Sequence, residues 1–221
     1  MIVVNKIKKL TPEDLQNGSE YELLKEVSHQ HLREFVMELV SQGKTIIRIY
    51  SIYQAIMMLI FVYLLTKGIV LYIKGYASLL IQVGSSMLFS VTALIVIHEL
   101  LHALAYLAMG ARRISFGVTL KKFVFYAMAD RQVIAPRAFH IVALAPFVVV
   151  KIICMVGVVQ FYNQPQLYFF LSLMCLHSLF CAGDIAMLAF YKLYPEKEIF
   201  NFDNKHEGKT YFYARNKTIE P

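Results

Sequence analysis

Four long apolar stretches dominate the sequence and limit what the chain can fold into. They cover about residues 49–66, 77–109, 140–162 and 167–191, and very few charged residues interrupt them. A helix of about 20 residues is enough to cross the hydrocarbon of a bilayer. The sequence therefore predicts four membrane-spanning helices, and the second is long enough to be tilted or to extend beyond the bilayer.

Composition and charge also favour a membrane protein. The 221 residues are 58% hydrophobic and 17% charged, whereas about a quarter of the residues of a soluble domain are charged. The formal net charge is +7. The basic residues adjoin the apolar stretches instead of forming a stripe with aromatic residues, so the lipid bilayer is the expected partner and nucleic acid is not.

The distribution of basic residues predicts the orientation in the membrane. The only basic residues between the first two stretches are Lys67 and Lys74. Six basic residues lie between the second and third: Arg112, Arg113, Lys121, Lys122, Arg131 and Arg137. The positive-inside rule therefore predicts that residues 110–139 and both termini are cytoplasmic.

This pattern divides the chain into three parts. Residues 1–45 are expected to form a cytoplasmic or interfacial segment, residues 46–193 a transmembrane domain, and residues 194–221 a polar cytoplasmic tail. Two short segments with an alternating residue pattern lie on either side of two lysines: Ile114–Val118 and Phe123–Ala127. This pattern predicts a β-hairpin at the membrane face.

The N-terminal segment contains two helix-start signals and no secretory signal peptide is expected. Thr11 precedes Pro12 and has Asp14 three residues on, which is typical of a capped helix start. Ser19 with Glu22 predicts a second helix by the same logic. The expected fold is mainly α: a polytopic bundle of about four transmembrane helices, with a short cytoplasmic β-hairpin and a soluble helical N-terminal segment.

The motif His98-Glu99-Leu100-Leu101-His102 carries the chemistry. Residues i and i+4 share one face of a helix, so both imidazoles can bind one Zn²⁺. Glu99 can accept a proton from a water that the metal makes acidic. Two histidines and a glutamate within an apolar stretch are costly unless they have a function.

A peptidase zinc needs a third protein ligand and one open position. The extended soluble motif fails, because Ala105 and Ala108 occupy its Gly and His positions, and no glutamate follows Glu99 until Glu196. The remaining intramembrane carboxylate is Asp184. At ~1.5 Å per residue, its depth of roughly 12 Å is close to that of the motif, roughly 15–21 Å. Gly183 beside it is expected to let the two helices approach closely.

Three further polar residues compete with this assignment or assist it. His177 lies seven residues before Asp184, on the same helical face, and is a candidate to contact substrate or to replace a ligand. Cys181 is a second possible ligand. Lys151 lies in the middle of the third stretch, where it can pair with a carboxylate or extend towards the membrane surface.

These features together resemble a bacterial family of membrane zincin peptidases with a domain of unknown function, distant relatives of the site-2 proteases. The resemblance covers about residues 80–190. It rests on His98–His102, Phe116-Gly117, Ala143–Pro146 and Gly183-Asp184.

The resemblance implies that His98, His102 and Asp184 hold zinc and that Glu99 is the catalytic base. Related proteins tend to carry an asparagine upstream of the ligand aspartate, where this chain has His177. The implied role of His177 is to replace that asparagine at the scissile carbonyl, or else the activity is altered.

The function expected from the sequence is an intramembrane zinc metallopeptidase of a bacterial cell membrane. Its cofactor is Zn²⁺, and its partners are membrane-embedded or membrane-adjacent peptide or protein substrates. An inactive regulatory scaffold that keeps the fold is an alternative. A metal transporter is another, although the polar groups cluster at one depth instead of crossing the membrane.

Overall fold

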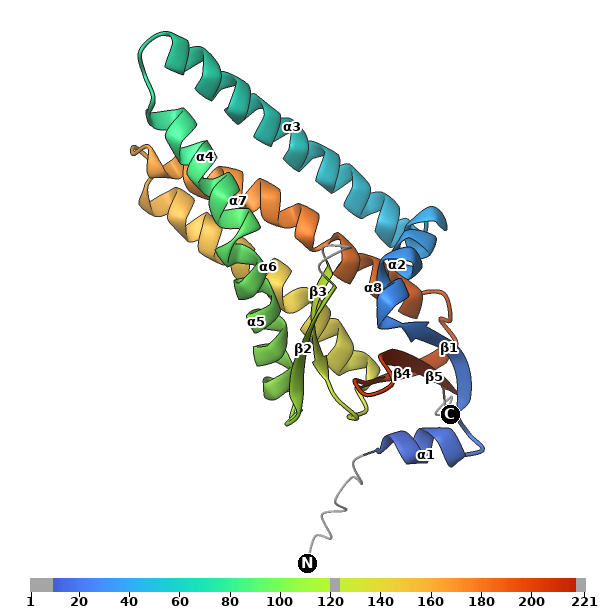
Figure 1. The fold of residues 1–221 in the computed structure, drawn as a ribbon. Coiled ribbons are helices and arrows are strands. Elements are labelled where there is room, and N and C mark those ends of the chain that lie inside the picture. The colour runs from blue at the N-terminus through green and yellow to red at the C-terminus, as the bar shows by residue number, and fades with distance from the viewer. Residues whose placement is uncertain (1–9, 120–123, 218–221) are drawn as a thin grey trace, which may run out of the picture.

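The computed structural model describes residues 10–119 and 124–217. The chain forms a long helical part with a small sheet at one end, beside which both described ends of the chain lie (Figure 1). The elements in order are α1 (Pro12–Asn17), β1 (Glu22–Ser28), the 3₁₀ turn η1 (His29–His31), α2 (Leu32–Ser41), α3 (Thr45–Ile73), α4 (Ser78–Val91), α5 (Ala93–Ala108), β2 (Ile114–Thr119), β3 (Val124–Ala129), α6 (Pro136–Gln160), α7 (Gln166–Phe180), α8 (Ala182–Tyr191), β4 (Lys197–Asn204) and β5 (Lys209–Asn216).

Two helices, α3 and α6, are each long and apolar enough to cross a membrane. The mean hydropathy of their most apolar windows is 2.3 and 2.6, and only 17% and 33% of those windows is buried inside the protein. Exposure of this large apolar surface to water would cost much free energy, whereas contact with lipid would not. The described residues therefore contain two candidate spans, or up to four if each of two bent helix pairs forms one span.

The first bent pair is α4 and α5, which meet at Thr92 at an angle of 50°. The backbone of Thr92 leaves the helical region (φ −117°, ψ −90°), and its hydroxyl donates to the Leu88 carbonyl at 2.7 Å. The second apolar stretch was expected as one helix, and this detail is wrong. The bend leaves α4 packed on α3 and α7, while α5 packs on α6 and β3.

The second bent pair is α7 and α8, which meet at Cys181 at an angle of 43°. The fourth stretch was also expected as one helix. Because of this break, the expected relation of His177 and Asp184 along one helix axis does not hold. The two residues lie on different helices.

The N-terminal segment follows the sequence prediction in its first helix and in α2, but not between them. Thr11 caps α1 and forms a reciprocal capping box with Asp14. The second helix, predicted to start at Ser19 and Glu22, is present only from Leu32 on as α2, because Glu22–Ser28 is strand β1. This strand pairs with β5 along its length, and tertiary pairing of this kind overrides a local helix signal.

The two ends of the chain build one antiparallel sheet with the order β1-β5-β4. Residues 194–221 were expected as a polar tail, but β4 and β5 bury Ile199, Phe200, Phe202 and Phe212. Phe190 of α8 contacts both Phe35 of α2 and Phe212 of β5, with ring centroids 5.6 and 4.8 Å away. The sheet is therefore packed against the helix that carries Asp184.

The β-hairpin prediction is confirmed: β2 and β3 form an antiparallel pair. The lysines expected at its turn lie in residues 120–123, outside the described residues. Gly117 is opposite Tyr126, and a Cβ at Gly117 would approach the Tyr126 ring to 2.2 Å. The glycine of the Phe116-Gly117 pair therefore makes room for a cross-strand aromatic ring.

Candidate metal centre

Helix α5 presents the two histidines of the HExxH motif on one face. His98 and His102 are both buried, and their Nε2 atoms are 3.1 Å apart. One turn of helix separates them, which places the rings one above the other with centroids 4.8 Å apart. The local helix therefore aims two nitrogen donors at one point.

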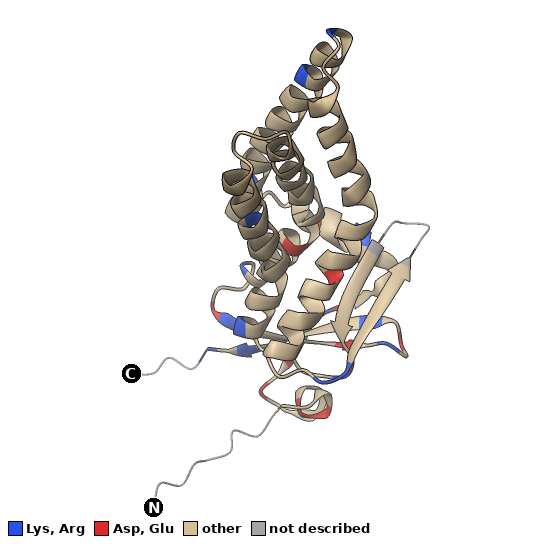
Figure 2. Ribbon diagram, turned by 90° about the vertical axis from the view of Figure 1, so that its left-hand side faces the viewer, with Lys and Arg blue, Asp and Glu red and all other residues tan. Residues whose placement is uncertain are grey.

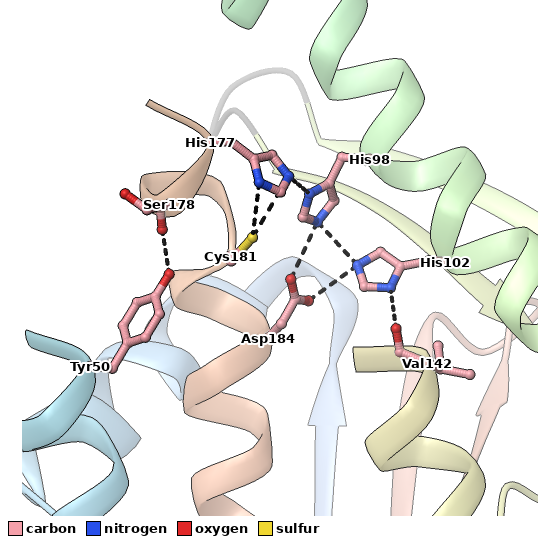
Figure 3. A network of polar contacts seen from close by, with 8 residues as sticks. All are labelled: Tyr50, His98, His102, Val142, His177, Ser178, Cys181 and Asp184. Atoms are coloured by element: carbon pink, nitrogen blue, oxygen red, sulfur yellow. Dashed lines mark hydrogen bonds and ion pairs between the residues drawn. The ribbon is translucent and has the colours of Figure 1, made fainter. Parts of the chain in front are cut away.

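Helix α8 brings a carboxylate to the same point (Figure 3). Asp184 Oδ2 is 3.3 Å from His98 Nε2, and Asp184 Oδ1 is 3.2 Å from His102 Nε2. A tetrahedral Zn²⁺ with ligands at about 2.0–2.1 Å separates two ligand atoms by about 3.3 Å. The three separations of 3.1–3.3 Å agree with that value. We call these three residues the metal cluster.

The tautomer of His102 shows why this cluster suits a cation. His102 Nδ1 is 3.0 Å from the Val142 carbonyl oxygen, which can only accept, so Nδ1 carries the proton. In the neutral ring, Nε2 then has only a lone pair, yet it faces another nitrogen and a carboxylate oxygen. Asp184 Oδ2 is buried and accepts no hydrogen bond among the described residues. A metal ion satisfies all of these lone pairs at once.

Pro146 explains why the Val142 carbonyl is available. In an α-helix this oxygen would accept from the N–H of residue 146, and proline has none. Val142 is therefore left with a free carbonyl inside α6, and His102 uses it. The Ala143–Pro146 motif lies within this helix and not at its start.

His98 is supported from the other side. Its Nδ1 is 3.2 Å from His177 Nε2, and His177 is completely buried. Cys181 Sγ is 3.7 Å from both ring nitrogens of His177, so it lies on the lone-pair axis of neither. His98, His177 and Cys181 form a second group with metal-ligand atoms close together. His98, however, directs its Nε2 at Asp184 and His102, so we take the group with Asp184 as the metal cluster.

Glu99 lies beside the metal cluster on α5. Its Oε2 is buried and has no hydrogen-bond partner among the described residues. Glu99 borders two hollows, of about 210 and 130 Å³. An unpartnered carboxylate oxygen on a residue that lines a cavity is available to take a proton from a bound molecule.

The larger hollow extends from the metal cluster to the terminal sheet. At its far end, His29 Nε2 is 3.2 Å from Thr210 Oγ1, and that hydroxyl donates to Asp203 Oδ1 at 2.5 Å. We call these three residues the sheet cluster. Burial, together with the nearby Asp203 carboxylate, raises the pKa of the Tyr126 phenol that lines this hollow, so Tyr126 stays neutral.

Two expected contacts are replaced by others. Lys151 has no carboxylate partner among the described residues; its ammonium donates to the Met174 carbonyl and lies 5.4 Å from the centre of the Tyr53 ring. A Cβ at Gly183 would meet nothing within 4 Å, so the expected close helix approach at Gly183 is wrong. Gly183 lines the larger hollow instead.

The contacts that surround the metal cluster were not predicted from the sequence. Pro146 was noted only as part of a motif, although an interior proline signals a free carbonyl four residues earlier. No local signal marks the sheet cluster, because its three residues come from opposite ends of the chain.

Residues 91–199 match the model of a protein family described as "Putative zincin peptidase". Over this segment the chain is similar to the members of that family. The zincin-peptidase segment holds the metal cluster, Glu99 and His177, whereas His29, Asp203 and Thr210 of the sheet cluster lie outside it. Searches of the curated proteins and of the solved structures found no match.

Proposed function

We propose that the protein is an intramembrane zinc metallopeptidase. The observation that carries this proposal is the convergence of two imidazole nitrogens and a carboxylate at 3.1–3.3 Å, next to an unpartnered Glu99 oxygen. The match to the zincin peptidases supports it independently. In this proposal His98, His102 and Asp184 hold the zinc.

The metal and the protein have separate tasks. Bound Zn²⁺ would supply Lewis acidity, which makes a coordinated water acidic and polarises a carbonyl. Glu99 accepts the proton of the attacking water at Oε2 and delivers it to the leaving amine. Its position between the two hollows fits a peptide that extends to both sides of the scissile bond.

Two groups hold the histidines in place. The Val142 carbonyl fixes the ring of His102, and His177 fixes the ring of His98. Such outer contacts raise ligand basicity and restrict ring rotation. His177 lines neither of the two hollows next to Glu99. We therefore assign it the role of a positioning residue and not of a group that contacts the scissile carbonyl.

Strand β3 supports a peptide substrate. It pairs with β2 on one edge, and among the described residues no strand pairs with its other edge. Phe125, Tyr126, Ala127 and Met128 of β3 line the larger hollow. An extended peptide can add to such an edge through main-chain hydrogen bonds. Loop charge favours cytoplasmic termini. The substrates that we propose for this hollow are membrane-embedded or membrane-adjacent peptide segments.

The test compares wild type with Glu99→Gln in proteoliposomes that contain a library of single-span peptides. Glu99→Gln removes only the proton acceptor, so zinc content should stay at the wild-type value while cleavage falls by about 10²–10⁴-fold. Mass spectrometry reports cleavage, and elemental analysis reports zinc. Glu38→Gln, on the exposed surface of α2, is the matched control and should cleave like wild type. Wild-type cleavage by Glu99→Gln would overturn the mechanism.

A further inference from the structure

A hollow of about 530 Å³ lies where α6 begins and α8 ends, against β4 and β5. Six of its lining side chains are basic or imidazole groups: Arg137, His140, Lys192, Lys197, Arg215 and Lys217. Glu198 is the one acidic residue of its lining. We call this hollow the basic pocket; it shares no lining residue with the hollows beside Glu99.

Three of these cations, Arg137, Lys192 and Lys217, have no acidic partner among the described residues, and Lys217 instead donates to the Pro195 carbonyl. Arg215 pairs with Glu198 at 2.8 Å, and Lys197 pairs with Glu22 at 2.6 Å. Arg137 and Lys192 are exposed, and no described acidic side chain lies within 4.0 Å of either. The pocket therefore has a net positive charge that an anion can neutralise.

The basic pocket lies at the end of the apolar helices. Arg137 is the second residue of α6, and Lys192 directly follows α8, the last part of a bent candidate span. Lys and Arg are frequent around the sheet end of the molecule, whereas the helices beyond it are nearly all uncharged (Figure 2). An anion in the pocket would therefore be at the boundary of the bilayer.

An exposed apolar stripe on α6 begins next to the pocket. Ile141, Val148 and Ile152 are 50%, 46% and 56% exposed. At about 100° per residue, these three side chains and Arg137 lie within about 60° of one another around the helix. One face of α6 therefore continues from an unpaired cation to an apolar surface.

We propose that the basic pocket binds the phosphate of an anionic phospholipid, with an acyl chain along Ile141, Val148 and Ile152. A soluble phosphate would leave the apolar stripe without a partner, and a zwitterionic lipid would leave the charge of Arg137 and Lys192 uncompensated. Juxtamembrane cations attract anionic lipid in this way, and each adds a several-fold preference.

The experiment titrates the delipidated full-length protein with phosphatidylglycerol or with phosphatidylcholine of the same acyl chains, and native mass spectrometry counts bound lipid. Wild type should prefer phosphatidylglycerol by roughly tenfold or more. The double variant Arg137→Gln/Lys192→Gln should lose this preference. The matched control Lys67→Gln/Lys74→Gln removes the same charge near the far end of α3 and should keep it.

Two further arms identify the source of the phosphate. Ile141→Ser/Ile152→Ser should weaken binding of phosphatidylglycerol without changing the weak binding of water-soluble glycerophosphoglycerol. Equal losses in the pocket and control variants would show general surface attraction and overturn the site. Displacement of the lipid by inorganic phosphate at equal concentration would assign the pocket to a soluble anion and overturn the lipid proposal.

Discussion

The metal cluster and the sheet cluster contain similar residues at two ends of one hollow, but they differ in how their polar atoms are satisfied. In the sheet cluster, His29 meets the Thr210 hydroxyl, and that hydroxyl donates to Asp203. Every donor there meets an acceptor. In the metal cluster, His102 Nε2 faces only atoms with lone pairs, and an Asp184 oxygen accepts nothing among the described residues.

This difference separates a structural polar group from a site. Buried polar atoms normally have hydrogen-bond partners, and an atom without one calls for a cause. The sheet cluster connects η1, β4 and β5, and its polar atoms are satisfied by one another. The metal cluster leaves lone pairs that a cation would satisfy. Lys151 is a structural polar group of the same kind as the sheet cluster, because a carbonyl and an aromatic ring already contact its ammonium.

The largest effect should come from exchanging one histidine of each cluster for alanine. His98→Ala and His102→Ala should each lose zinc under competition from a chelator, because two ligands rarely retain it. His29→Ala should keep one zinc per chain and instead lower the free energy of unfolding by about 1–3 kcal/mol, since its hydrogen-bond partner loses a donor. Elemental analysis and thermal unfolding provide the two readouts. If His29→Ala also lost zinc, that result would be enough to remove the distinction between the clusters.

A smaller effect is expected from Pro146→Ala. The new N–H should bond to the Val142 carbonyl and compete with His102, so zinc affinity should fall by about tenfold. The same change should raise the unfolding temperature of the zinc-free protein, because an interior proline costs a helix about 3 kcal/mol. Pro136→Ala, at the first position of α6 where no helical bond is lost, is the matched control. An unchanged affinity for Pro146→Ala would show that the Val142 contact does not hold His102.

The support of His98 can be graded in a third comparison. His177→Ala should weaken zinc binding by about tenfold, and His177→Gln should restore part of it, because a side-chain oxygen can accept from His98 Nδ1–H. Cys181→Ser should have little effect, since the sulfur contacts His177 and is not one of the three ligands of the metal cluster. Zinc competition titrations measure all three. Unchanged affinity in His177→Ala, or zinc loss in Cys181→Ser, would each be contrary to this assignment.

The helices and the two histidines could be predicted because their sequence signals are local. The carboxylate of the metal cluster could be predicted because few candidates exist. Long apolar stretches predict α3 and α6. The spacing of His98 and His102 predicts that both lie on one face of a helix. Asp184 followed from the scarcity of intramembrane carboxylates. The break at Thr92 had no clear signal, because α4 and α5 pack on different neighbours that are distant in the sequence. Strand β1 has residues that suit a helix, and only its pairing with β5 makes it a strand.

The central claim is that zinc is held by two imidazole nitrogens and the Asp184 carboxylate. X-ray absorption at the zinc edge of the metal-loaded wild type tests it most directly. We expect nitrogen and oxygen neighbours only, at about 2.0–2.2 Å, and a weaker zinc affinity in Asp184→Asn. A sulfur neighbour at about 2.3 Å that disappears in Cys181→Ser, with unchanged zinc in Asp184→Asn, would place the metal on His98, His177 and Cys181 and contradict the claim.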